Sequence, residues 1–133
     1  MIYVIDTNII TAVLKGKEKV KRKIQGLIFE GNKIFINCIS YYEIKRGLLA
    51  VKAKSQLKRF EKLCEKLGLI LLDNPVIFDE ASEIYADLKQ KGKLINDADI
   101  LIAAITKSNN HILVSDDTDF ERIEGLKIEN WLK

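Results

Sequence analysis

The chain has 133 residues, of which 47% are hydrophobic and 31% are charged, and its formal net charge is +3. This composition is typical of one globular domain, so we expect a single domain over residues 1–133 with a substantial hydrophobic core. The longest apolar run, residues 100–105, is much shorter than the roughly 18 residues of a membrane span, so we expect no membrane insertion. The two cysteines, Cys38 and Cys64, have no paired spacing, so we expect a cytoplasmic protein without disulfides.

Hydrophobic spacing divides the chain into strands and helices that alternate. Apolar residues recur at helical spacing in residues 20–28 and 77–88, whereas IFIN, LILL and ILVS are apolar runs of strand length. The predicted strands lie near residues 2–5, 34–37, 69–72 and 111–114, and the predicted helices near residues 8–14, 18–30, 40–51, 54–67, 76–91 and 98–108. This alternation indicates an α/β fold with a mainly parallel sheet covered by helices on both faces.

Residues that break helices fall where these elements should begin or end. The only proline, Pro75, falls where the first turn of a helix tolerates proline. Gly31, Gly68 and Gly92 fall where helices should stop, because glycine readily adopts the conformation that ends many helices. No linker, repeat or low-complexity segment divides the chain.

Asp6, Thr7 and Asn8 directly follow the first predicted strand. A buried parallel strand delivers its next side chain to the carboxyl edge of the sheet, where open α/β sheets bind ligands. A local role is also open, because Asp6 or Thr7 could cap the helix that follows. Residues elsewhere in the chain are needed to distinguish a binding site from a helix cap.

A strongly basic segment, residues 15–23, comes next and contains one acid, Glu18. Its bases are Lys15, Lys17, Lys19, Lys21, Arg22 and Lys23. Such a segment can bind a polyanion, and it can equally be the solvated face of a surface helix.

Further acids follow the other predicted strands. They are Glu43 after the second strand, Asp97 and Asp99 at the start of the apolar helix ILIAAI, and Asp116, Asp117 and Asp119 after the last strand. Each also fits a local role, since Ser40 and Glu43 fit a capping box, Asp97 fits an N-cap, and SDDTD fits a polar turn. Four separate segments nevertheless bring an acid to one edge of the sheet, which favours a shared site over four coincidences.

Carboxylates gathered at one edge need a counter-charge. Two of them about 5 Å apart repel by roughly 3 kcal/mol at an effective dielectric constant of about 20, so they take up protons or bind a cation. No cysteine lies near them, and the only histidine, His111, starts a strand, where packing is its expected role. The ligands are therefore all oxygen, which favours Mg²⁺ or Mn²⁺ over zinc.

Asp97 and Asp99 cannot both reach one ion from inside a helix, because residues two apart point roughly 200° away from each other. We assign Asp99 to the metal, since its helical face continues through the small residues Ala103 and Thr106. Asp97 is predicted to cap the helix and to hold a metal-bound water.

Four short motifs occur in order along the chain: DTNI at 6–9, EI at 43–44, DILIAA at 99–104 and SDDTDF at 115–120. Together they resemble the motifs of PIN-domain ribonucleases. The closing residues resemble the tail of VapC-type toxins of toxin–antitoxin pairs, particularly the branch that cleaves initiator transfer RNA. The resemblance covers nearly the whole chain and implies a PIN-like three-layer α/β/α sandwich around a mainly parallel sheet of four to five strands.

The resemblance also implies roles for individual residues. The catalytic, metal-binding acids would be Asp6, Glu43, Asp99 and Asp117. Thr7 or Ser115 would supply a nearby hydroxyl. The loop after the last strand is one residue shorter than in the transfer-RNA branch, so Asp116 or Asp119 is an alternative to Asp117 as the fourth ligand.

Chemistry and resemblance together indicate an endoribonuclease that hydrolyses RNA phosphodiester bonds with one or two Mg²⁺ or Mn²⁺ ions. The resemblance alone implies transfer RNA as one possible substrate, and the shorter loop leaves the choice of RNA open. Because an acidic site repels RNA, bases must hold the flanking phosphates, and the candidates are Arg46, Lys45 and the basic segment 15–23, above all Lys19 and Lys23. The expected partners are RNA, a cognate antitoxin protein and a second copy of the chain. Two alternatives stay open: an inactive PIN-like RNA-binding or scaffold protein, and a Mg²⁺-binding receiver-like signalling module, for which Asn37 is a poor phosphoacceptor.

Overall fold

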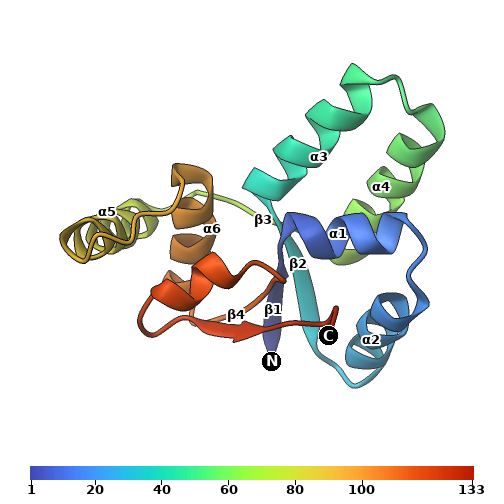
Figure 1. Ribbon diagram of the computed structural model, residues 1–133. Helices are drawn as coiled ribbons and strands as arrows, with labels where there is room; N and C mark the ends of the chain where they lie inside the picture. The colour runs from blue at the N-terminus through green and yellow to red at the C-terminus, as the bar shows by residue number, and fades with distance from the viewer.

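The computed structural model describes all 133 residues, which form one sheet and the helices around it (Figure 1). The strands are β1 (Ile2–Ile5), β2 (Lys33–Asn37), β3 (Leu69–Ile70), β4 (Ile112–Val114) and β5 (Lys127–Glu129). The helices are α1 (Thr7–Leu14), α2 (Glu18–Phe29), α3 (Cys38–Ala50), α4 (Lys54–Leu67), α5 (Pro75–Gln90), α6 (Asp97–Ser108) and the short 3₁₀ helix η1 (Thr118–Arg122). None of these helices is both long and apolar enough to cross a membrane.

The five strands form one sheet in the order β3-β2-β1-β4-β5, and every neighbouring pair is parallel. The predicted mainly parallel sheet is therefore confirmed, with five strands. β1 lies at its centre, between β2 and β4. The residues that follow β1 consequently stand in the middle of the carboxyl edge.

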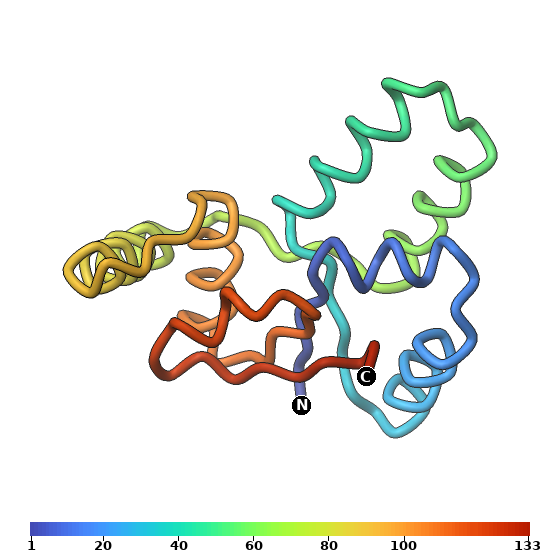
Figure 2. The backbone as a smooth tube through the Cα atoms, viewed as in Figure 1, coloured from blue at the N-terminus to red at the C-terminus, as the bar shows by residue number.

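Helices cover both faces of the sheet, which confirms the predicted three-layer sandwich (Figures 1 and 2). β4 shows how the faces are separated, because Ile112 and Val114 belong to the core beneath α1, α2 and α4, while Leu113 belongs to the core beneath α5 and α6. Phe60 and Phe120 are fully buried, one in each core. Burial of such a side chain contributes about 1.5–3 kcal/mol to the free energy of unfolding.

Two features of the sheet differ from the prediction. β3 is shorter than expected and pairs only through Leu69 and Ile70. β5 was not predicted, because its three residues contain a single apolar side chain, Ile128, and show no apolar run. It forms because β4 leaves an open edge, to which residues 127–129 bond in parallel register.

The starts of α3 and α6 also differ from the prediction. The Oδ1 atom of Asn37 accepts from the Ser40 N–H at 2.8 Å, so α3 begins two residues earlier than expected, and the proposed capping box of Ser40 and Glu43 is wrong. Asn96 caps α6 by accepting from the Asp99 N–H at 2.9 Å. The prediction that Asp97 is the cap is therefore also wrong, since Asp97 is already the first helical residue.

The residues predicted to break helices act as expected. Pro75 opens α5 after the capping residue Asn74. Gly68 follows α4 with φ of 83°, and Gly31 and Gly92 also have positive φ just after α2 and α5. A side chain at Gly68 would be strained for this reason, and its Cβ would also contact the ring of Phe35 at 3.6 Å.

Candidate active site

The carboxyl edge of the sheet holds an open pocket of about 560 Å³. β2, β1 and β4 lie side by side and end in Asn37, Ile5 and Val114. The Asp6 N–H donates to the carbonyl of Val114 at 3.0 Å, which fixes the end of β1 beside β4. The pocket is lined by Asp6, Thr7, Asn8, Thr11, Ala12, Lys15, Lys17, Glu43, Asn96, Asp99, Asp117 and Leu132. Four predicted metal ligands, from four separate segments of the chain, therefore face one space.

Asp6 is the buried acid of this pocket, with an exposed fraction of 5%. Its Oδ2 accepts a 2.8 Å hydrogen bond from the hydroxyl of Ser115, and its Oδ1 accepts a 3.4 Å hydrogen bond from the hydroxyl of Ser40. Asp6 stands at the N-cap position of α1, but its side chain makes no capping hydrogen bond, so capping does not explain this acid. Burial raises the pKa of the Asp6 carboxyl, and the charges of Asp117 and Glu43 raise it further.

Hydroxyl and amide groups connect Asp6 to Glu43. The hydroxyl of Thr7 lies 2.8 Å from Oγ of Ser40 and 3.2 Å from Oε1 of Glu43. The side-chain amide of Asn37 donates to Oγ of Ser40 at 2.9 Å and to the carbonyl of Ile5 at 3.0 Å. Glu43 is thus held by a neighbouring element rather than by the start of its own helix, and its carboxylate is available to the pocket.

Asp99 lies in the first turn of α6. Asn96 accepts from its N–H and also donates from Nδ2 to its Oδ2, both at 2.9 Å, so one residue fixes both the helix and the carboxylate. Burial, followed by the charges of Asp6 and Asp117, raises the pKa of the Asp99 carboxyl to about 6. Asp99 therefore stands where negative charge is already concentrated.

Asp97 points elsewhere, as the helical spacing predicts. It is exposed and lines a different pocket, together with Phe78 and Tyr85 of α5. The prediction that Asp97 holds a metal-bound water is therefore not supported by its position.

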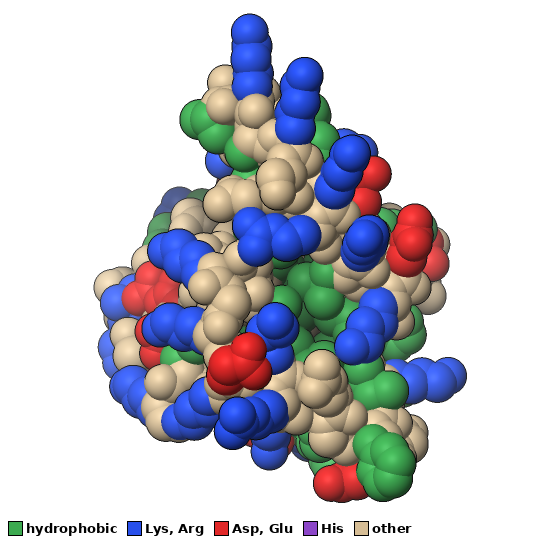
Figure 3. All heavy atoms as spheres, turned by 90° about the vertical axis from the view of Figure 1, so that its right-hand side faces the viewer, with side chains coloured by type: hydrophobic (Ala, Val, Ile, Leu, Met, Phe, Trp, Pro, Cys, Tyr) green, Lys and Arg blue, Asp and Glu red, His purple; other side chains and the backbone are tan.

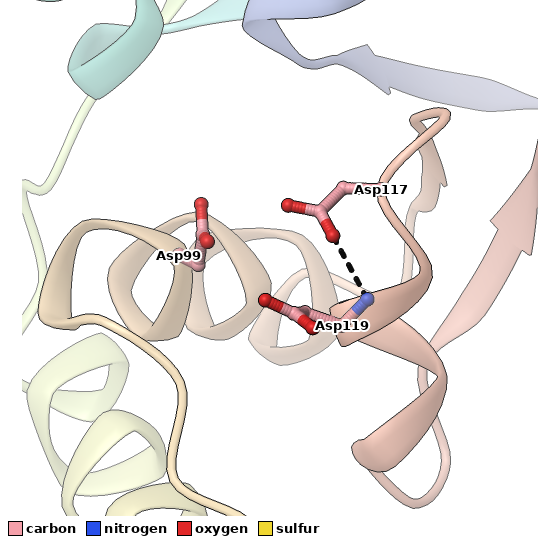
Figure 4. Close-up of side chains that lie close together, drawn as sticks. All are labelled: Asp99, Asp117 and Asp119. Carbon is pink, nitrogen blue, oxygen red and sulfur yellow. Dashed lines mark hydrogen bonds between the residues drawn. The ribbon is translucent and has the colours of Figure 1, made fainter.

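The loop after β4 contains three acids, Asp116, Asp117 and Asp119, and Figure 4 shows two of them, Asp117 and Asp119, beside Asp99 of α6. One carboxylate oxygen each of Asp99, Asp117 and Asp119 lies within 4.8 Å of the others. Oδ1 of Asp117 accepts from the Asp119 N–H at 2.9 Å, while Oδ1 of Asp119 lies 3.4 Å from Nη2 of Arg122. Only Asp117 lines the pocket of Asp6. Asp116 turns away, because its Oδ1 accepts from Asn130 at 2.7 Å.

Several residues of the pocket were not assigned to it from the sequence. Asn8 donates to Oγ of Ser115 at 3.3 Å and accepts from the Asp116 N–H at 3.2 Å, so it ties the start of α1 to the loop after β4. Lys15 and Lys17 also line the pocket. Asn8 belongs to the DTN sequence and the lysines to the basic segment, but nothing local in the sequence shows that they share one site.

The other bases predicted to bind RNA lie outside this pocket. The Lys45 ammonium donates to the Tyr41 hydroxyl at 3.0 Å, and the Arg46 guanidinium lies 5.0 Å from the ring centre of Tyr42. Lys19 and Lys23 line a separate cleft between α2 and the C-terminal segment. A contact of any of them with RNA stays a prediction.

The residues of the pocket fit a divalent cation. Every candidate ligand is an oxygen atom, and neither cysteine nor histidine lines the pocket. The half-buried His111, directly before β4, has its pKa lowered by burial. The raised pKa values of Asp6 and Asp99 reflect burial and crowding of like charges, which a bound cation relieves. The fold and the site thus define an α/β protein with an oxygen-only, carboxylate-rich site at the carboxyl edge of a parallel sheet.

Comparison with known proteins narrows this class. Residues 3–126 match the PIN domain family. Over 136 residues the chain is 32% identical to Ribonuclease VapC2 of Rickettsia felis, with all of both chains covered. The crystal structure of VapBC2 from Rickettsia felis, bound to a DNA fragment from their promoter, aligns with a TM-score of 0.91 and 28% identity over 98% of this chain and 99% of that one. The structure of VapBC-1 from nontypeable Haemophilus influenzae aligns with a TM-score of 0.88 and 26% identity over the whole of both chains. The chain belongs to the PIN domain family and, within it, to the VapC ribonucleases.

Proposed function

We propose that the protein is a metal-dependent endoribonuclease and the toxin of a toxin–antitoxin pair, and that it acts in the cytoplasm, where its half-buried free cysteines stay reduced. The observation that carries the proposal is the pocket in which Asp6, Glu43, Asp99 and Asp117 meet beside two lysines. The names of the VapC ribonucleases to which the chain is similar support the same activity.

The carboxylates are proposed to hold one or two Mg²⁺ or Mn²⁺ ions. When bound, such an ion lowers the pKa of a water molecule and neutralises charge on the scissile phosphate. Ser115 and Ser40 orient the carboxylate of Asp6, and Asn96 orients that of Asp99. These partners keep the oxygens in place before the cation arrives, which is the usual task of groups behind metal ligands.

A carboxylate-lined pocket repels RNA, and the positive charges of Lys15 and Lys17 offset this repulsion. Lys15 and Lys17 stand at the rim formed by the end of α1 and the start of α2, where they can hold the phosphates on either side of the scissile bond. Lys45 and Arg46 remain candidates farther along α3. The resemblance to the branch that cleaves initiator transfer RNA makes transfer RNA the first substrate to test.

The proposed partners are an antitoxin and a second copy of the chain. The structural relatives from Rickettsia felis and Haemophilus influenzae are VapBC assemblies, which supports an antitoxin for this protein. Figure 3 shows an apolar hollow surrounded by Lys and Arg side chains on the face that contains α2 and α4. An amphipathic antitoxin segment could place its apolar side chains in this hollow and its acidic side chains beside the surrounding bases. Tyr42 within α3, Val51 just after α3, and Phe78 of α5 also leave large apolar side chains exposed.

Incubation of the purified protein with total RNA and with transfer RNA tests the activity. We expect cleavage in Mg²⁺ or Mn²⁺ and none in excess chelator. Asp99→Asn, purified in the same way, should lose the activity, and Asp97→Asn should keep it, because only Asp99 lines the pocket. No cleavage by the wild-type protein, with metal and RNA both bound, would favour an inactive RNA-binding protein. Equal cleavage by wild type and Asp99→Asn would indicate a contaminating nuclease.

A further inference from the structure

A second cleft, of about 700 Å³, lies between α2 and the C-terminal segment. It is lined by Lys19, Arg22, Lys23, Glu129, Asn130, Trp131 and Lys133, so four bases face one acidic side chain. Three of the bases lie on α2 at spacings of three and four residues, which places them on one face of the helix, while Val20 and Ile24 bury the other face. This cleft is not part of the pocket that holds the four acids.

The bases of this cleft have no acidic side chain as a partner. No side-chain carboxylate lies within 4.0 Å of a side-chain nitrogen of Lys19, Arg22, Lys23 or Lys133. The one acidic side chain of the cleft, Glu129, accepts a 3.1 Å hydrogen bond from Nε1 of Trp131. Like charges four residues apart, as at Lys19 and Lys23, destabilise a helix slightly, so this face of α2 gains stability when an anion lies over it.

The wall opposite α2 is held in a fixed position. Asn130 donates to Asp116 at 2.7 Å and accepts from the Leu132 N–H at 2.9 Å. The ring of Trp131 packs against Tyr3 with ring centres 5.5 Å apart. The Lys19 ammonium donates to the main-chain oxygen of Lys133 at 2.6 Å, which joins the two walls of the cleft. The cleft is therefore formed before any ligand binds.

The cleft also adjoins the acidic pocket. Leu132 lines the acidic pocket, while its neighbours Trp131 and Lys133 line the basic cleft. On the other wall, Lys17 lines the acidic pocket and Lys19, two residues later, lines the cleft. The linings of the two pockets therefore meet at residues 17–19 on one wall and at residues 131–133 on the other.

We propose that the cleft between α2 and residues 129–133 is a second phosphate-binding site, which holds the RNA strand to one side of the bond that is cut. This inference rests on the proposed ribonuclease activity and adds a site to it. RNA phosphates suit the cleft because its bases lack acidic side-chain partners and its walls are fixed. The cleft also adjoins the acidic pocket, which by itself repels a polyanion and therefore needs positive charge beside it. Binding there raises the affinity of the whole strand without touching the reacting bond.

The adjacent pair Arg22 and Lys23 provides the test, because both line the cleft, both are exposed and neither side chain makes a hydrogen bond or ion pair. The variant is Arg22→Gln with Lys23→Gln. The matched control is Lys58→Gln with Arg59→Gln, an exposed adjacent pair on α4 that lines neither pocket. Both variants lose two positive charges, so a general electrostatic effect would be equal in the two.

The probe is a fluorescein-labelled oligouridylate of about 12 nucleotides, titrated against each protein in chelator at several salt concentrations. We expect the cleft variant to bind about tenfold more weakly at low salt, with the slope of log affinity against log salt reduced by about 1.4, the value for two lost phosphate contacts. The control variant should match the wild-type protein. Equal weakening in both variants, or no weakening in either, would overturn the proposal.

Trp131 supplies an independent signal, because it is the only tryptophan of the chain and lines the cleft. We expect unlabelled oligouridylate to change its fluorescence in the wild-type and control proteins, and to change it far less in the cleft variant at the same concentration. Unchanged fluorescence in wild-type protein saturated with the oligonucleotide would show that the strand takes another path, which overturns the proposal.

The second site and the ribonuclease activity can fail separately. If the protein cleaves RNA but the cleft variant binds it normally, the second site is wrong and the ribonuclease activity stands. If the cleft variant binds oligouridylate normally but loses affinity for a hexaglutamate peptide, the cleft belongs to an acidic protein segment and the proposal is overturned. If RNA binds through the cleft without being cleaved, the site is correct and the proposed activity fails.

Discussion

The hydroxyl of Ser115 donates a 2.8 Å hydrogen bond to Oδ2 of Asp6, although the two residues are 109 positions apart in the sequence. β1 and β4 are parallel neighbours, so the residues that follow them meet at the same edge. Oγ of Ser115 also accepts from the Asp117 N–H at 3.0 Å and from Asn8 at 3.3 Å. One hydroxyl therefore joins the buried acid of the pocket to the loop that supplies another acid.

Replacement of this hydroxyl should weaken metal binding without removing a ligand. We expect Ser115→Ala to lower the affinity for Mn²⁺ about tenfold, because Asp6 loses the donor that orients it and its pKa rises. Titration calorimetry measures the change. Ser82→Ala is the control, since the Ser82 hydroxyl bonds only to the carbonyl of Phe78 on exposed α5. Equal affinity in Ser115→Ala and wild type would contradict the role given to Ser115.

Asp99 should couple metal binding to stability. At a Mg²⁺ concentration 100 times the dissociation constant, the ion stabilises the folded protein by about 2.7 kcal/mol, so the melting temperature of the wild-type protein should rise clearly. Asp99→Asn should lose most of that rise, because it removes a charged oxygen from the pocket. Asp97→Asn should keep it. If both variants keep the rise, the assignment of Asp99 to the metal is wrong.

The same acid should make the metal-free protein less stable as the pH rises. The pKa of Asp99 is about 6 in the folded protein against 3.8 for the free side chain, so the folded state holds this proton more tightly than the unfolded state. Its stabilising effect is present at low pH and is lost as the pH rises through this interval. In chelator, Asp99→Asn should therefore melt above the wild type at about pH 7.5, and the difference should disappear near about pH 4.5. If the melting temperatures of the two proteins differ by the same amount at both pH values, the pKa of Asp99 is not raised in the folded protein.

Asp117 and Asp119 should differ in their effect on metal binding. Asp117 lines the pocket with Asp6, whereas the carboxylate of Asp119 lies beside the guanidinium of Arg122. Asp117→Asn keeps the cap of η1, because asparagine caps as well as aspartate, so this variant tests the charge alone. We expect Asp117→Asn to weaken Mn²⁺ binding more than Asp119→Asn does. The reverse order would identify Asp119 as the ligand.

Lys17 and Arg46 should also have unequal effects on RNA cleavage. Lys17 lines the acidic pocket, while Arg46 lies over the exposed ring of Tyr42 outside it. We expect Lys17→Ala to lower the single-turnover rate at saturating RNA about tenfold or more, because it removes a charge that positions the phosphate. Arg46→Ala should mainly weaken binding. A larger loss of rate in Arg46→Ala would identify Arg46, rather than Lys17, as the positioning residue.

The sequence by itself determined the order and class of the elements. Apolar runs and helical spacing are local properties, so they placed β1, β2 and β4 and all six α-helices within a few residues of their observed positions. Alternation of strands and helices then required a parallel sheet, whose carboxyl ends meet at one edge. That rule is enough to bring Asp6, Glu43, Asp99 and Asp117 to one edge before any distance is known.

Only the tertiary structure decided which of several chemically equal residues takes each role. Asparagine, aspartate and serine cap helices about equally well, so the sequence could not choose Asn37 over Ser40 or Asn96 over Asp97. Asn37 caps α3 because the end of β2 holds it beside the carbonyl of Ile5, a contact across 32 positions.

β5 and the walls of both pockets depend on contacts between distant segments in the same way. Residues 127–129 become a strand only because β4 offers an open edge, and that pairing places Leu132 in the acidic pocket and Trp131 in the basic cleft. The spacing of apolar residues indicates which face of a segment packs against the core, but it does not indicate which other segment lies beside it. Local pattern and parallel topology bring acids from four segments to one edge, and the family resemblance selects among them. The hydrogen-bond partners of these acids and the positions of the bases around the two pockets follow from packing.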